Sequence, residues 1–189
     1  MHARNVRILL VPALLLATAG SLRAQQGAVE IGVDAAVAYE TEAEVFTASA
    51  PFGGTIGAFV GPQSGIRVGF FLTDAVALEP VVNFQFVDTS DDDPEAAFAS
   101  AAKLLYHFST DPEATRLYVG VGPTLTVINT SDTDSQFGLT GELGAKVPVQ
   151  ERIGLRFAAG FRHGFDTDDF PETNVIFGTF GLSVFLGGS

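Results

Sequence analysis

The feature that most constrains the fold of this chain is an alternation of apolar and polar residues with a period of two. The alternation recurs in eight segments of about ten to thirteen residues, which turn-forming residues separate. Successive side chains of a β-strand point to opposite faces, so each segment is expected to form a strand with one apolar and one polar face. The expected strands are 28–39, a strand that ends at residue 72 and whose start the pattern does not define, 76–87, 96–108, 116–128, 136–147, 153–165 and 174–186.

The charged residues within these segments all lie on one face. The other face carries no charge and is rich in Phe, Val, Leu and Ile, whereas the charged face is rich in Gly. Six basic and four acidic residues share that face, and buried charges must be paired, so the pattern favours a narrow closed lumen. Glycine leaves room there for long Arg side chains. The residues expected to form a charge network in this lumen are Glu30, Asp34, Arg67, Glu79, Lys103, Arg116, Glu142, Lys146, Arg156 and Arg162.

The length of the segments matches the thickness of a membrane. A strand of about twelve residues rises about 3.3 Å per residue, and a tilt near 40° leaves roughly 30 Å of height, which is the thickness of the hydrocarbon core. The sequence therefore predicts an all-β fold, an eight-stranded antiparallel up-and-down transmembrane β-barrel. An even number of strands places both chain ends on one side of the membrane.

The connections are expected to alternate in length, with short turns facing the periplasm and longer loops facing the cell exterior. The expected short turns are 73–74, 109–115 and 148–152. The expected outer loops are 40–63, 88–95, 129–135 and 166–173.

Residues 1–24 are predicted to be a cleaved signal peptide, which leaves residues 25–189 as the barrel domain. Arg4 and Arg7 precede an apolar run over residues 8–19, and small residues lie near a cut placed after Ala24. The run is too short for a spanning helix, which needs roughly 20 residues.

Composition excludes several functional classes. The chain has no Cys, so it has no disulfide, thiol nucleophile or thiolate zinc site. Its net charge of -12 argues against a nucleic-acid partner, whose phosphates need basic residues. A hydrophobic content of 47% excludes an acidic disordered chain.

The chain resembles the small outer-membrane β-barrel family, the eight-stranded group of Gram-negative bacteria. The stretches that carry the resemblance are 65–74 (GIRVGFFLTD), 78–80 (LEP), 104–108 (LLYHF), 160–165 (GFRHGF) and 169–171 (DFP). The resemblance implies a location in the outer membrane. It also implies contact with membrane lipid and lipopolysaccharide, insertion by the barrel assembly machinery, and a monomer.

The end of the chain is similar to a barrel assembly signal, with one departure. Thr179, Gly181, Val184 and Leu186 fit the pattern, but bacterial barrels usually end on an aromatic residue and this chain ends in Gly-Gly-Ser. The chain also lacks Trp, so its interfacial aromatic girdles are expected to rely on Tyr39, Tyr106 and Phe.

The acidic loops are a candidate cation site. Carboxylates there can bind a divalent cation that bridges them to lipopolysaccharide phosphates, although the spacing matches no calcium loop. The alternative is a solvated loop that self-repulsion holds away from the membrane. The residues concerned are Asp91, Asp92, Asp93, Asp168 and Asp169, all expected to face the exterior.

The histidines do not indicate an enzyme. His107 and Ser109 are close in sequence, but His107 has lumen parity and lies at the expected periplasmic end. His163 is followed by Gly164 rather than by a nucleophile, and no phosphate-binding loop is present. We therefore expect no catalytic residue, no cofactor and no bound metal of a recognisable type.

These observations predict a structural or surface role, namely membrane integrity, adhesion or a contact made by the loops. One alternative is a narrow porin-like channel for small solutes or apolar molecules, for which Pro80 and Pro123 are weak indications of a break in the strand ladder. The other is a soluble periplasmic barrel of lipocalin type, which needs the apolar face to point inward.

Overall fold

The fold is described by a computed structural model. It describes residues 27–50, 55–56, 61–87, 95–111, 113–129, 133–167 and 171–187. The expected signal peptide and the five acidic loop residues, 91–93 and 168–169, lie outside these ranges. The signal peptide and the loop hypothesis therefore stay predictions.

The described chain contains ten β-strands. In order they are β1 (Val29–Glu40), β2 (Val45–Ser49), β3 (Thr55–Ile56), β4 (Gly65–Phe71), β5 (Val76–Val87), β6 (Glu95–His107), β7 (Arg116–Asn129), β8 (Thr133–Gln150), β9 (Ile153–Gly164) and β10 (Thr173–Leu186). No helix in the described ranges has the length and apolar character needed to cross a bilayer.

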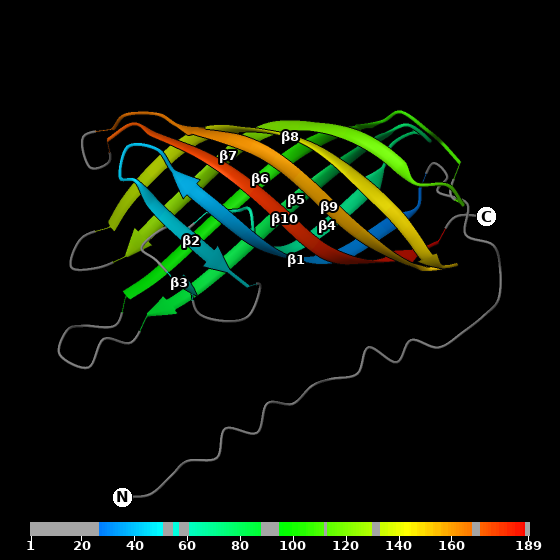
Figure 1. Cartoon of the computed structure of the whole chain (residues 1–189), viewed down its shortest axis with the longest axis horizontal. Coiled ribbons are helices and arrows are strands. Elements are labelled where there is room, and N and C mark those ends of the chain that lie inside the picture. The colour runs from blue at the N-terminus through cyan, green and yellow to red at the C-terminus, as the bar shows by residue number, and fades with distance from the viewer. Residues whose placement is uncertain are drawn as a thin grey trace, which may run out of the picture.

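Eight of these strands close into an antiparallel barrel, as the sequence predicts. The hydrogen-bonded order runs from β10 back through β9, β8, β7, β6, β5 and β4 to β1, and β1 then pairs with β10 over its whole length (Figure 1). The start of β1 and the end of β10 lie at one end of the barrel. Connections 72–75, 108–115 and 151–152 lie at this end, which faces the periplasm in barrels of this type.

The two remaining strands correct the expected loop over 40–63. One edge of β1 pairs with β10. Along the opposite edge, Val29 to Asp34 pair with β4, and Ala36 to Glu40, nearer the outer end, pair with β2. β3 then pairs with β2. The pattern left the start of the second barrel strand undefined because a short β2–β3 hairpin completes part of the wall before β4 begins.

The connections are less regular in length than expected. β8 begins at Thr133, so only residues 130–132 separate it from β7, whereas the periplasmic connection 108–115 is longer. The β7–β8 pairing continues to Asn129 and Thr133, which extends this hairpin beyond the predicted strand ends.

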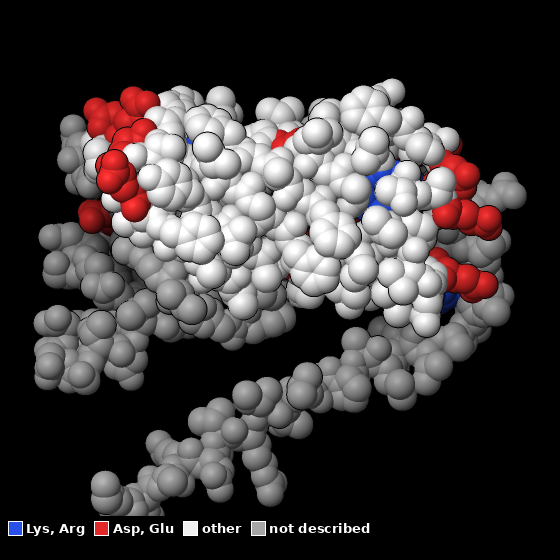
Figure 2. All heavy atoms as spheres, viewed as in Figure 1, with Lys and Arg blue, Asp and Glu red and all other residues white. Residues whose placement is uncertain are grey.

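The apolar face of the barrel points outward, which makes the lipocalin alternative wrong. Leu104, Val121 and Phe180 are among many large apolar residues that are half exposed, while all ten predicted lumen charges are buried. Figure 2 shows acidic side chains gathered at the two ends and a broad, mostly uncharged middle. Tyr39 and Tyr106 are also half exposed, near opposite ends of the barrel, where interfacial girdles are expected.

The two mid-strand prolines interrupt the ladder without shifting the register. β4 and β5 pair on both sides of Pro80 but not at its level, and the β6–β7 pairs resume in the same register around Pro123. Both prolines face outward, where a missing backbone donor disturbs only the local ladder.

Inward glycines make room for large lumen side chains. A Cβ added at Gly32 would collide with the guanidinium of Arg67, and one added at Gly144 would collide with the ring of Tyr118. Gly141, which faces outward, has open space: an added Cβ would meet only the Gly120 carbonyl oxygen, at 3.9 Å. Glycine is therefore required at the inward positions by close packing.

We predict that Gly32→Val lowers the free energy of unfolding by about 1–3 kcal/mol, because it overpacks the lumen and displaces Arg67. Gly141→Val is the matched control and should leave that free energy within about 0.5 kcal/mol. Urea unfolding in lipid vesicles, followed by heat-modified gel mobility, measures both variants. Equal stability of the two variants would contradict the packing argument.

Candidate functional site

All ten charges that the sequence assigns to the lumen face lie inside the barrel, and eight of them form one network of ion pairs. Each of the ten is less than a tenth exposed. The network is electrically balanced, with four carboxylates and four cations. Its members are Glu30, Asp34, Glu79, Glu142, Arg67, Lys103, Lys146 and Arg156.

Arg67 on β4 joins one half of the network. Its Nη1 pairs with Glu30, its Nε donates to Asp34 Oδ2 at 2.9 Å, and its Nη1 also lies 3.6 Å from Glu79 Oε2. Nη2 donates to Ser183 Oγ at 2.6 Å, and Ser183 in turn donates to Glu30 at 2.7 Å. One guanidinium therefore ties β4 to β1, β5 and β10.

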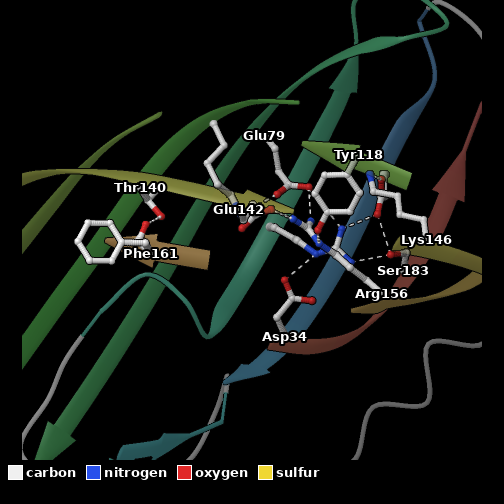
Figure 3. Close-up of polar contacts among 12 residues, drawn as sticks. Asp34, Glu79, Tyr118, Thr140, Glu142, Lys146, Arg156, Phe161 and Ser183 are labelled. Atoms are coloured by element: carbon white, nitrogen blue, oxygen red, sulfur yellow. Dashed lines mark hydrogen bonds and ion pairs between the residues drawn. The ribbon is translucent and has the colours of Figure 1, made fainter. Parts of the chain in front are cut away.

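Arg156 on β9 joins the other half. Its Nη1 pairs with Glu79 Oε2 at 2.5 Å, its Nη2 pairs with Glu142, and its Nε donates to the hydroxyl of Tyr118 at 2.5 Å. Its guanidinium also lies over the Tyr118 ring, 4.8 Å from the centroid. Figure 3 shows Glu79, Glu142 and Tyr118 gathered around Arg156.

Two lysines link the remaining carboxylates. Lys103 Nζ lies 3.1 Å from Glu79 Oε1 and 3.0 Å from Glu142 Oε2, and Lys146 Nζ lies 2.5 Å from Glu30 Oε2. Since Glu79 contacts both arginines and Lys103, it connects the two halves. The network thus crosses the lumen from wall to wall.

Arg116 and Arg162 lie in the lumen on either side of the network. Arg116 begins β7 near the periplasmic end, and its guanidinium lies over the rings of Phe71 and Phe185, at 5.5 and 5.4 Å from their centroids. Arg162 lies toward the outer end and donates to Thr126 Oγ1 at 3.0 Å. These two residues account for the excess of basic over acidic residues on the lumen face.

The lumen is also occupied above and below the network. At the periplasmic end, Phe71, His107 and Tyr118 form an aromatic layer with ring centroids 5.3 and 5.8 Å apart. Toward the outer end the segment 61–64 is buried, and Asn83 Nδ2 donates to the Gly61 carbonyl and to Ser64 Oγ, both at 3.1 Å. Protein atoms therefore occupy three successive levels of the interior.

The histidines are engaged by their surroundings. His107 Nδ1 lies 3.3 Å from the Ala75 carbonyl, and Ser109 Oγ accepts the amide of Asp111 at 3.2 Å. His163 Nδ1 lies 2.9 Å from Asn174 Oδ1 on the outer part of the wall. Among the described residues, no three His, Cys, Asp or Glu side chains are grouped so as to hold a metal ion.

A carboxylate outside the membrane-spanning wall fixes the β1–β2 turn to β10. Glu42 accepts hydrogen bonds from the backbone amide and the Nδ2 of Asn174, both at 2.7 Å. These bonds to the ionised form lower the pKa of Glu42 to about 2. The carboxylate therefore stays ionised in mildly acidic conditions and keeps the turn on the barrel rim.

Charge parity did not reveal two uncharged residues that form hydrogen bonds with the network. Tyr118 and Ser183 share the lumen face with the charges, but an uncharged polar residue on a glycine-rich face gives no indication of its partner. The one signal available for Tyr118 is Gly144, which pairs with it across β7 and β8, because the bulky ring needs a glycine opposite it. Recognising that pair requires the register between the two strands.

Residues 9–186 match the family described as the outer membrane protein beta-barrel domain. This chain belongs to that family. It is accordingly an outer-membrane barrel of a Gram-negative bacterium, as the sequence predicted. None of the curated proteins matches the chain.

Solved structures with the same fold are distant in sequence. Neisserial surface protein A has a TM-score of 0.55 at 15% identity, and the match covers 83% of this chain and 95% of that one. The N-terminal barrel domain of Pseudomonas aeruginosa OprF has a TM-score of 0.51 at 18% identity, with 86% and 99% covered. OprG from the same organism has a TM-score of 0.50 at 14% identity, with 87% and 98% covered. These likenesses show the fold alone.

We predict that Arg67→Ala lowers the free energy of unfolding by about 3–5 kcal/mol, because it leaves Asp34 buried without its cation and leaves Glu30 with Lys146 as its one cationic partner. Glu151→Ala, at an exposed position of a periplasmic turn outside the network, is the control and should change stability by about 0.5 kcal/mol or less. Urea unfolding in lipid vesicles measures both. An unchanged midpoint for Arg67→Ala would show that the network does not support the barrel.

Proposed function

We propose that this chain is a non-conducting outer-membrane barrel whose work is done at its outer rim, in membrane integrity, adhesion or loop-mediated contact. The observation that carries the proposal is the balanced ion-pair network, which fills the lumen from wall to wall. The lumen then serves stability, and the segments outside the membrane serve function.

The filled interior argues against the porin-like alternative. An eight-stranded barrel encloses a space just wide enough for side chains. Here the aromatic layer, the network and the buried segment 61–64 occupy successive levels of it. A solute would have to separate buried charges from their partners, which is costly in a low-dielectric interior.

The connections at the outer rim carry acidic residues and no basic ones. After residue 24 the chain has seven basic residues, and six of them lie in the lumen while Arg152 lies in a periplasmic turn. The segments that connect strands in this part of the chain, 41–44, 50–54, 57–64, 88–94, 130–132 and 165–172, contain no Lys or Arg. Every charge that these segments present is therefore negative.

This charge distribution limits the class of partner. A rim without cations repels polyanionic ligands and attracts cationic surfaces, either directly or through divalent cations that bridge to lipopolysaccharide phosphate. Such attraction is screened by salt because the charges are solvent-exposed. We therefore infer that the contact, whatever its biological partner, is made with cationic groups.

In planar lipid bilayers the wild-type barrel should produce no steady current steps, because the network blocks the lumen. The double variant Glu79→Ala/Arg156→Ala keeps the net charge, removes the central pair and should produce a small measurable conductance. Regular open-channel steps from the folded wild-type protein would overturn the proposal in favour of the channel.

Intact cells that display the barrel should bind fluorescent poly-lysine, because the outer connections carry only negative charge. The triple variant Asp91→Asn/Asp92→Asn/Asp93→Asn should weaken binding by about three- to tenfold at low salt while the barrel still assembles.

The control for the rim removes the same number of negative charges from the other end of the barrel. The variant Asp111→Asn/Glu113→Gln/Glu151→Gln changes two periplasmic turns and should leave poly-lysine binding unaffected. Stronger binding of heparin than of poly-lysine to cells that display the wild-type barrel would contradict the proposal that the rim binds cationic groups.

A further inference from the structure

The lipid-facing wall carries a groove that the proposed function does not use. The groove has a volume of about 800 Å³ and crosses β2, β1, β10, β9, β8 and β7. Small residues line it: Ala48, Gly178 and Ala159 form its floor, and Ala35 and Ala145 flank Phe180 and Phe157 in the neighbouring row. Phe157, Phe180, Leu117 and Leu143 stand beside them.

The strand register explains why the groove exists. One row of paired outward residues runs from Ala48 through Val37, Gly178 and Ala159 to Leu143. The row on its periplasmic side contains the ring pair Phe180 and Phe157, whose centroids are 5.2 Å apart. A row with small side chains at its centre therefore lies beside two aromatic rings that project further into the lipid.

The row on the outer side of the groove is bulky as well. It runs through Phe46, Tyr39, Ile176 and Phe161, which are paired in register and all largely exposed. These four side chains stand between the groove and the outer rim. The groove is thus bounded by apolar ridges on two sides.

The groove descends toward the periplasmic leaflet. Each step along a row from one tilted strand to the next lowers the position by about 3 Å, so five steps lower it by roughly 15 Å. Consistently, Ala35 lies six residues from the periplasmic end of β1, whereas Leu117 is the second residue of β7, just above a periplasmic turn. The lower end therefore opens beside Leu117 and Ala145.

We propose that this groove holds one acyl chain of a periplasmic-leaflet phospholipid, lying along the small-residue floor and held more tightly than the surrounding lipid. The face that contains the groove is the barrel's lipid-facing surface, so the molecules that meet it are membrane lipids. An acyl chain fills a trough between rings with dispersion contacts that a bulky flat wall does not offer. The outer ridge separates the floor from lipid A chains, and the lower opening faces phospholipid.

The site accepts side chains that would fill it. A Cβ added at Gly178 would make only ordinary contacts, with Val37 Cγ2 at 3.6 Å and the Ala158 carbonyl oxygen at 3.9 Å. Gly178→Leu and Ala159→Phe therefore occupy the groove without disturbing the lumen network. Ala102→Phe, at an exposed outward position of β6 that does not line the groove, is the matched control.

Because the chain has no Trp, a single Trp reports on its own site. Phe157→Trp reports on the groove wall, and Leu104→Trp reports on a part of the lipid face outside the groove. The two positions lie four and three residues from the periplasmic ends of β9 and β6, and they are 45% and 50% exposed. Heat-modified gel mobility establishes that each variant is folded.

The experiment measures Trp quenching in dioleoylphosphatidylcholine vesicles that contain increasing fractions of phosphatidylcholine brominated on its acyl chains. Phe157→Trp should reach half quenching at a fraction about two- to threefold lower than Leu104→Trp, as a van der Waals preference predicts. Adding Gly178→Leu or Ala159→Phe should remove the difference. Adding Ala102→Phe should preserve it.

Three results would overturn the proposal. Coincident quenching curves would mean that the groove binds lipid no better than the rest of the wall. Weaker quenching at Phe157→Trp together with a cross-linked dimer would mean that a second copy of the chain covers the groove. Loss of quenching on adding lipopolysaccharide, with no loss on adding unbrominated phospholipid, would assign the groove to lipid A chains.

Discussion

The interior of the barrel depends on the pairing of Arg67 and Arg156 with four buried carboxylates. Each guanidinium is fully enclosed and contacts carboxylates from other strands, so neither can move without leaving a charge unpaired in a low-dielectric space. This constraint fixes what lies around it. Gly32 and Gly181 are small because Arg67 and Asp34 occupy the space their side chains would take, and Gly144 is small because Tyr118 supports Arg156. The network and the glycines form one packed unit.

The set of residues that line the lumen was largely predictable from the sequence. The period of two assigns each side chain to the lumen face or the lipid face, and this assignment does not require the register between strands. The parity of Glu79, Lys103 and Arg156 placed them in the lumen, and the structure brings them together there. β5 was predicted with the observed bounds, since turn residues flank it on both sides. Which charge pairs with which required the register between strands and the direction of each side chain, and parity contains neither.

The features that the sequence did not predict also depend on contacts between strands or on residues without charge. β2 spans only five residues, too few for an alternation to stand out, and it becomes a strand because the outer edge of β1 needs a hydrogen-bonding partner. Tyr118 and Ser183 carry no charge, so nothing in the pattern separates them from the other polar residues on their face. The groove was not predictable for a further reason. Ala48, Ala159 and Gly178 lie far apart in the chain and form a floor only once three strand pairings set them in one row.

The lumen face and the lipid face of the same strands differ in what fills the space beside their small residues. On the lumen side the protein must fill its own space, and glycine occurs where another side chain already occupies the volume, as at Gly144 beneath Tyr118. On the lipid side the membrane supplies the filling atoms, so a small residue such as Gly178 leaves space that the protein itself does not close. Close packing is as necessary for dispersion energy in lipid as it is in a protein core. A lipid-facing trough bounded by aromatic ridges is therefore completed by an acyl chain, in the same way that the lumen is completed by Arg67 and Arg156.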